Sequence, residues 1–141
     1  MHSNGTQAQA TPFAALIADA TEIRDNLLQA ADDLAYALER EQQTRRTAKE
    51  QRDAYEAHEA ELVAEAYATA TGKNAETRKA EVDAAKVAAQ RVGVLAKPLA
   101  MRNAAENEAD EARNACEQMN ARYLALRAAA ELTAAILSAA K

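Results

Sequence analysis

The chain has 141 residues, and its formal net charge of -5 arises from 17 basic and 22 acidic residues. Alanine fills 40 positions, whereas leucine, isoleucine, valine and phenylalanine together fill only 21, and there are three glycines and two prolines. This composition excludes β-sandwiches and barrels, which need β-branched and aromatic strands, and doubly wound α/β folds, which need glycine-rich loops. The abundant helix formers and the mixed signs of the charges predict folded helices in a single all-α domain rather than a disordered chain.

The N-terminus is polar and lacks the charged and then apolar layout of a signal peptide, so we expect residues 1–10 to be a disordered tail. Cys116 is the only cysteine and cannot form a disulfide within the chain. Together these features predict a cytoplasmic protein. No uninterrupted apolar run approaches the roughly 18 to 20 residues of a membrane span, so we expect no membrane contact.

Thr11 followed by Pro12 is a typical helix start, and no further proline or glycine occurs before Gly72. We therefore predict one long helix over residues 11–71. Apolar residues within it recur in alternating steps of four and three, as in a coiled coil. This seam comprises Leu16, Ala20, Ile23, Leu27, Ala30, Leu34 and Ala37; it fades through Glu41, Thr44, Ala48 and Gln51 and returns at Tyr55, His58 and Leu62.

Residues 72–74 predict a corner between two antiparallel helices. Gly72 is expected to adopt the left-handed conformation that ends a helix, and Asn74 to cap the next one, with Glu76 in its first turn. The second helix is predicted over residues 75–92.

A second break is expected over residues 93–99, because Pro98 removes a helical hydrogen bond and Gly93 precedes it. Few polar turn residues occur there, so we expect an interruption between two roughly collinear segments, the second over residues 100–139. The seam of this last segment comprises Ala105, Ala109, Ala112, Cys116, Met119, Tyr123, Leu126, Ala130, Thr133 and Leu137.

The predicted fold is therefore a long, coiled-coil-like helical hairpin over residues 11–141, in which residue i lies opposite residue 146 minus i. A hairpin buries only one stripe per helix, and this register leaves Ile17, Leu28, Leu38, Leu124 and Leu132 on the outside. We expect a dimer that forms a four-helix bundle. The alternative is a monomeric three-helix bundle, if the second break reverses the chain. The predicted protein interface comprises Leu16, Ile23, Leu27, Leu34, Met119, Tyr123 and Leu126.

No residue pattern indicates catalysis or metal binding. His58 lies on the predicted seam without the second histidine of a zinc motif or the Glu-x-x-His of a di-iron site, so packing is its expected role. Cys116 is expected to be a buried, inert thiol. The acidic residues between positions 106 and 111 occupy several helix faces and predict a solvated patch. We therefore expect no enzyme and no cofactor.

Charge is unevenly distributed along the chain. Residues 1–39 carry one basic and six acidic residues, whereas residues 73–102 carry seven basic and three acidic ones. With the middle of the first helix, a basic band arises that comprises Arg45, Arg46, Lys49, Arg52, Lys97 and Arg102. Such a band could contact nucleic-acid phosphates. Four acid–base pairs spaced i, i+4 between residues 41 and 56 indicate instead a surface that neutralises itself.

Residues 66–80, with an aromatic helix followed by Gly72-Lys73-Asn74-Ala75-Glu76 and then Arg78-Lys79, resemble a stretch in small helical accessory proteins of bacteriophages and prophages. The resemblance implies a phage or prophage origin, action in the host cytoplasm and a small accessory role, with no catalytic residues. We predict a non-enzymatic protein that self-associates and binds a protein partner through helix faces. Nucleic-acid binding in phage DNA metabolism is the alternative.

Overall fold

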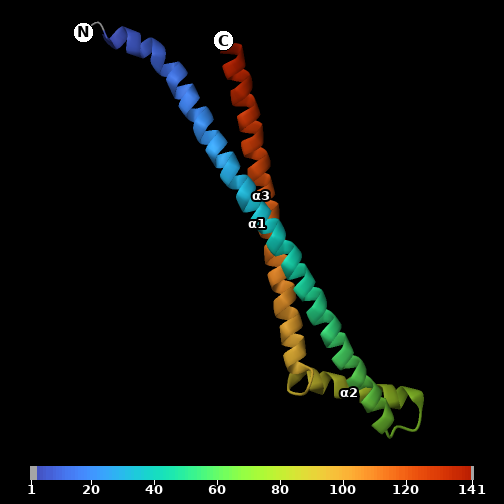
Figure 1. The fold of residues 1–141 in the computed structure, drawn as a ribbon. Coiled ribbons are helices and arrows are strands. Elements are labelled where there is room, and N and C mark those ends of the chain that lie inside the picture. The colour runs from blue at the N-terminus through green and yellow to red at the C-terminus, as the bar shows by residue number, and fades with distance from the viewer. Residues whose placement is uncertain (1–2, 141) are drawn as a thin grey trace. The chain divides into compact units, whose positions relative to one another are not determined.

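The computed structural model describes the backbone of residues 3–140 and the side chains of residues 12–140. These residues form an all-α hairpin of three helices: α1 (Ser3–Thr69), α2 (Ala75–Arg91) and α3 (Ala96–Ala140) (Figure 1). No strand occurs among them. The predicted fold class is thus confirmed.

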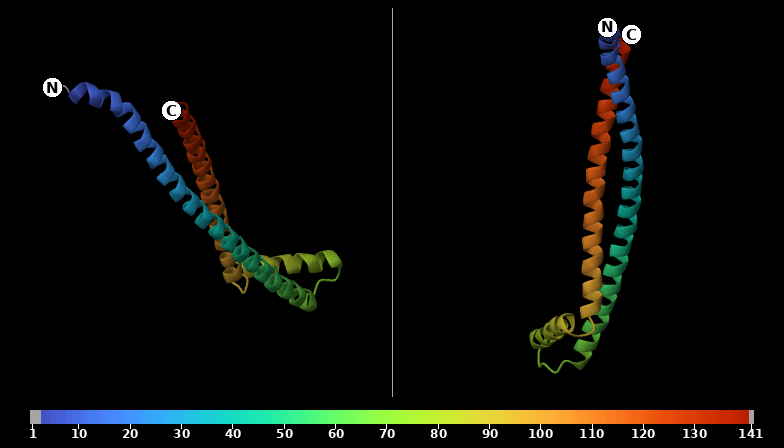
Figure 2. Two further views of the ribbon diagram at one scale, coloured as in Figure 1. Left: turned by 45° about the horizontal axis from the view of Figure 1, so that its top comes forward. Right: turned by 90° about the vertical axis from the view of Figure 1, so that its left-hand side faces the viewer.

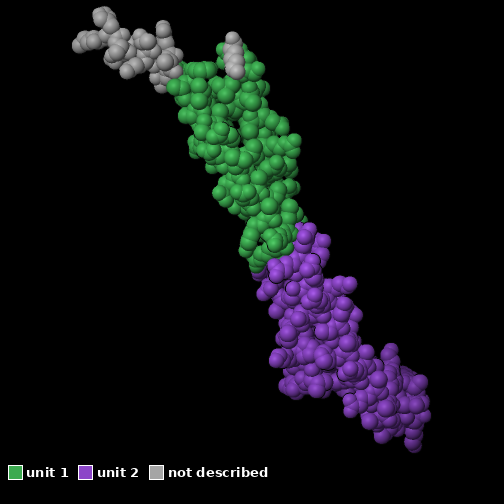
Figure 3. All heavy atoms as spheres, viewed as in Figure 1, with its two compact units in different colours: residues 1–40, 113–141 green, residues 41–112 purple. Residues whose placement is uncertain are grey.

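The chain divides into two compact units (Figure 3). Unit 1 combines residues 1–40 with residues 113–141, so it contains the first part of α1 and the last part of α3. Unit 2 is residues 41–112 and contains the rest of α1, all of α2 and the start of α3. In Figure 1 and in the left view of Figure 2, the two helical segments of unit 1 approach each other toward residues 40 and 113 and diverge toward the ends of the chain. Unit 2 adds α2 as a third segment.

The first helix begins earlier than the sequence predicts. It starts at Ser3 and contains Pro12, so the predicted tail over residues 1–10 and the start at Thr11 are not observed; residues 1 and 2 lie outside the described residues. Proline inside a helix removes one backbone hydrogen bond but does not prevent the helix from continuing on both sides. The helix also ends at Thr69 rather than at residue 71.

The first corner confirms the predicted cap but not the predicted glycine conformation. Asn74 Oδ1 accepts hydrogen bonds from the Thr77 backbone N–H and from Thr77 Oγ1, both at 2.8 Å. No glycine has a positive φ, so the left-handed Gly72 is wrong. A Cβ at Gly72 would lie 2.9 Å from Arg78 N and from Thr77 Cβ, so Gly72 is needed for close backbone approach. Glu81 accepts hydrogen bonds from the backbone N–H groups of residues 71 and 72, which ties the corner to α2.

The second break is a corner, and the prediction of collinear segments is wrong. It occupies only residues 92–95, and Figures 1 and 2 show α2 leaving the line of α3 sharply. Pro98 lies in the first turn of α3, where its missing N–H would have no helical partner. A Cβ at Gly93 would lie 2.7 Å from Ala89 Cα, so the chain turns closely against α2.

The predicted register holds for α2 but not for α3. Lys86 contacts Glu59 and Gln90 contacts Tyr55, each within one position of the prediction. Opposite Asp33, however, the structure has Arg122 where the register predicts residue 113. The corner at residues 92–95 turns α2 aside, so α3 runs along α1 about ten residues out of the predicted register.

The seams themselves are confirmed by burial. Every predicted seam residue of α1 from Leu16 to Tyr55, and every one of α3 from Ala105 to Leu137, is buried or half-buried. His58 is the exception: it is exposed, and Glu59 takes the inward position. The buried set is small in volume, and Leu95 is its only large side chain with less than 2% exposure.

Gly93→Ala is expected to lower the free energy of unfolding by about 1–3 kcal/mol, because the new methyl group overlaps the α2 backbone at Ala89. Val94→Ala is the matched control, since Val94 is 73% exposed and its truncation should change stability by less than about 0.5 kcal/mol. Urea unfolding followed by circular dichroism measures both. Equal stabilities of the two variants would contradict the close turn.

Candidate functional site

The three helical segments of unit 2 meet at Tyr55 of α1. Its side chain is 3% exposed, and its hydroxyl accepts a hydrogen bond from Gln90 Nε2 of α2 at 2.7 Å. The guanidinium carbon of Arg102, on α3, lies 4.5 Å from the centre of the Tyr55 ring, within the range of a cation–π interaction. One side chain of α1 therefore binds both α2 and α3.

An ion pair extends this polar cluster by one helical turn. Lys86 Nζ of α2 lies 2.9 Å from Glu59 Oε1 of α1, with the two side chains 35% and 27% exposed. The hydrogen bond from Lys86 lowers the pKa of Glu59, against an opposing effect of desolvation, and hydrogen bonding from Tyr55 lowers it further. The bond to Glu59 raises the pKa of Lys86. Each partner therefore stabilises the charged form of the other.

Beneath the cluster lies the only apolar core found among the described residues that includes large side chains. It is formed by Tyr55, Ala89 and Leu95, with Leu62 and Leu99 packed against it. Arg102 Nε is buried here without a hydrogen-bond partner, whereas the guanidinium lies over the Tyr55 ring and donates a hydrogen bond to Asn103. Its positive charge also contributes to the lowered pKa of Glu59. The contacts of Tyr55 with Gln90 and Arg102, and of Glu59 with Lys86, join α1 to α2 and α3, which is what a structural junction requires.

The sequence contained a signal for this junction that the seam analysis missed. Residues 55 and 59 are spaced i, i+4 on α1, and residues 86 and 90 are spaced i, i+4 on α2, so each pair lies on one helix face. In the register predicted from the first corner, the two pairs lie opposite each other. This match is not apparent when His58 is assigned to the seam, because Glu59 is then placed outside it.

Three residues of the predicted basic band, Arg45, Arg52 and Arg102, each contact a different side chain. Arg45 pairs with Glu41, Arg52 Nε lies 3.5 Å from Glu106 Oε1, and Arg102 stacks on Tyr55. Of the four i, i+4 pairs expected between residues 41 and 56, the pair of Arg45 with Glu41 is confirmed. Because α3 is displaced from the predicted register, Tyr55, and not Arg45, lies against Arg102. Exposed residues Arg46, Lys49 and Lys97 complete the band.

The remaining candidates for chemistry lie apart. Cys116 is buried as predicted, at 8% exposure. His58 is exposed, and His2 lies outside the described residues. Among those residues no three histidine, cysteine or acidic side chains are grouped so that they could hold a metal ion.

Unit 1 presents the second notable surface. Its seven predicted interface residues are all only half-buried along α1 and α3. Large apolar side chains stand outside the seam, including all five expected there; the exposed set is Phe13, Ile17, Leu28, Tyr36, Leu38, Leu124, Leu132 and Ile136. Leu28 is 60% exposed and Leu132 is 64% exposed. Two packed helices thus leave much apolar surface uncovered.

One helix is long and apolar enough to cross a membrane by length and composition alone. It is α3, which contains an 18-residue window of mean hydropathy 1.3, none of it buried. The expectation that no stretch approaches a membrane span therefore needs correction, because alanine and leucine raise the mean although charged residues interrupt the run. Two of these charges, Arg127 and Glu131, form an ion pair at 3.3 Å.

Together, the fold and these surfaces define a class: an all-α helical hairpin with a three-segment junction in unit 2 and an incompletely covered helix pair in unit 1. Comparison with protein-family models, with curated proteins and with solved structures finds no match to this chain. A proposal for its function therefore has to rest on the residues and surfaces described above.

Glu59→Gln is expected to lower the free energy of unfolding by about 0.5–1 kcal/mol at pH 7, because the ion pair with Lys86 is lost from a partly exposed site. The pKa of Glu59 is lowered in the folded state, so its contribution is present above the unfolded pKa and is lost as the pH falls through the folded one. The pKa of Lys86 is raised, so its contribution is lost only as the pH rises through the folded value.

Urea unfolding measured from pH 7 down to pH 3 tests this expectation. The stability difference between the wild type and Glu59→Gln should shrink as the pH falls through the lowered pKa that Glu59 has in the folded state. Glu61→Gln is the control, since Glu61 is exposed and two positions away on the same helix. A pH-independent difference would show that the ion pair does not link α2 to α1.

Proposed function

We propose that this protein is a non-enzymatic helical assembly module that works by self-association through unit 1. The observation that carries the proposal is the uncovered apolar surface of that unit. Its buried residues are Ala30, Ala37 and Cys116, whereas its leucine, isoleucine, methionine and tyrosine side chains are half-buried or exposed. A second helical layer would complete this burial, and a second copy supplies one in the form of a four-helix bundle.

Energetic considerations support a partner of large helical surface. Complete burial of one aliphatic side chain contributes about 1.5–3 kcal/mol, so covering the exposed half of a leucine contributes about 1 kcal/mol. Association costs roughly 4–15 kcal/mol in lost freedom of motion. Several of the eight exposed side chains must therefore be covered together, which favours side-by-side helices over a short peptide.

Charge supports the same partner. The described part of α1 in unit 1 carries six acidic residues against Arg24 and Arg40, whereas α3 in this unit has three arginines against two glutamates. Asp33 and Arg122 already pair between the two helices at 3.5 Å. In a bundle of two copies, α1 of one copy beside α3 of the other would repeat this complementarity.

A bilayer is a weaker explanation of the exposed part of α3. The side chains of Arg127 and Glu131 are 59% and 70% exposed, and charged side chains near the centre of a bilayer cost about 2.5–3.5 kcal/mol each. Cytoplasmic location therefore stays part of the proposal, as does action beside a further protein partner. The basic band offers no observation that favours nucleic acid over self-association.

The double variant Leu28→Glu/Leu132→Glu is expected to lose association through unit 1. Both side chains are mostly exposed, so their replacement removes intermolecular contacts and spares the hairpin. Sedimentation velocity over a range of concentrations should give a lower average mass for the variant than for the wild type. Val94→Glu is the matched control, because it places the same charge at an exposed valine of unit 2.

Two outcomes would contradict the proposal. One is a monomeric wild type at every concentration, and the other is an unchanged mass for the double variant. Flotation with anionic lipid vesicles provides a further arm. Binding of the wild type to vesicles that the Leu132→Glu change abolishes would assign the apolar surface of α3 to a membrane instead.

A further inference from the structure

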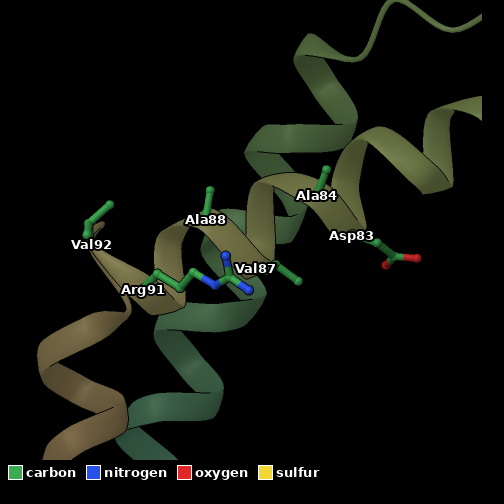
Figure 4. A pocket seen from close by; sticks show the side chains of 6 residues that line it. All are labelled: Asp83, Ala84, Val87, Ala88, Arg91 and Val92. Atoms are coloured by element: carbon green, nitrogen blue, oxygen red, sulfur yellow. The ribbon is translucent and has the colours of Figure 1, made fainter.

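The outward face of α2 carries a shallow hollow of about 590 Å3 (Figure 4). Its lining residues are all exposed; five of them belong to α2 and the sixth, Val92, follows its last residue: Asp83, Ala84, Val87, Ala88, Arg91 and Val92. The surface between Asp83 and Arg91 is apolar, with Val87 47% exposed, and Val92 beyond Arg91 is 92% exposed.

This face points away from the core of unit 2. The buried residues of α2 are Val82 and Ala89, and Ala89 packs in the core with Tyr55 and Leu95. At about 100° per residue, Val87 lies well over a quarter turn from both, so the hollow and the buried stripe occupy opposite sides of one helix. Packing within unit 2 therefore does not cover Val87.

Opposite charges bracket the apolar face symmetrically. Asp83, Val87 and Arg91 are spaced i, i+4, i+8, so the acid and the base stand four residues on either side of the valine. They are about 12 Å apart along the axis, too far to pair with each other. Neither forms an ion pair within the part of the chain that the structure describes.

We propose that this face binds the same face of a second copy, with the two α2 helices antiparallel about a two-fold axis at Val87. Each Asp83 then lies opposite Arg91 of the partner subunit, and the two Val87 side chains meet at the axis. Ala84 and Ala88 are small enough to let the two backbones approach closely. A parallel arrangement would place like charges opposite each other, so the charge pattern selects the antiparallel one.

This contact is independent of the association proposed for unit 1, because it uses α2 alone. A variant that lacks the unit 1 contact therefore leaves the α2 contact to be measured alone.

The test uses the full chain carrying Leu28→Glu/Leu132→Glu, which removes the unit 1 contact. This chain should still form dimers in sedimentation equilibrium. Adding Asp83→Lys should weaken dimerisation at least tenfold, because residue 83 then faces Arg91 of the partner subunit. Adding Asp83→Lys together with Arg91→Asp should restore it, because the exchanged charges again face each other. These variants leave Val82 and Ala89, the buried residues of α2, unchanged.

Crosslinking gives a second measurement that does not depend on charge. Val87→Cys should form a disulfide between two copies under mild oxidation, whereas Ala84→Cys should not, because the antiparallel arrangement separates the two copies of residue 84 by about 9 Å along the axis. Cys116 is buried and serves as an internal control.

A monomeric Leu28→Glu/Leu132→Glu chain at all concentrations would overturn the α2 contact and leave the unit 1 proposal intact. Failure of the charge exchange to restore dimers, or crosslinking of Ala84→Cys as fast as Val87→Cys, would also overturn it. An unchanged mass of the Leu28→Glu/Leu132→Glu chain relative to the wild type would instead contradict the unit 1 proposal.

Discussion

Two α-helices that pack together can bury only the stripe that each presents to the other. In unit 1 only the small residues Ala30, Ala37 and Cys116 of that stripe are buried, and its larger side chains remain half-buried. In unit 2 the chain adds α2 as a third segment, and there Tyr55 and Leu95 become almost fully buried. Three packed segments therefore bury large side chains in unit 2, whereas two packed segments leave large apolar side chains exposed in unit 1.

The sequence is sufficient to predict which face of each long helix is buried, because that face follows from spacing alone. Leu16 and Leu137, at opposite ends of the two seams, are both half-buried as the alternating steps of four and three require. The Asn74 cap is equally local, since it depends on one side chain and the N–H group three residues later. Both features were predictable because they depend on neighbouring residues alone, whereas the local prediction of a left-handed Gly72 was wrong.

The register between helices could not be obtained in the same way. It depends on the direction that the chain takes at residues 92–95, and that direction is set by the contact of Gly93 with Ala89 and by the burial of Leu95. Gly93 and Pro98 indicate that the helix is interrupted, but they do not show whether the chain kinks or turns a corner there. The contact of Tyr55 with Arg102 therefore could not be predicted. The contacts between α1 and α2 could have been predicted if Glu59, instead of His58, had been assigned to the seam.

The proposed resemblance of residues 66–80 to phage accessory proteins rests largely on residues at a tight corner, and tight corners restrict the choice of residues. Both Gly72 and Gly93 are required by neighbouring atoms closer than a Cβ allows, and Asn74 by its cap. Any helical hairpin with corners this tight would select similar residues for the same physical reasons. Shared corner residues therefore indicate a shared turn. Evidence of a shared function has to come from surfaces that the turn does not constrain.

Such surfaces are the outward apolar side chains, which no internal contact requires. A leucine on a water-exposed helix face adds little to the stability of the hairpin, and alanine would form the helix equally well. Leu28 and Leu132 stand at such positions in a chain whose most abundant residue is alanine, at 40 of 141 positions. Large apolar residues where the fold needs none are more readily explained by contacts between molecules than by contacts within one, and on that ground assembly is the function that the structure supports best.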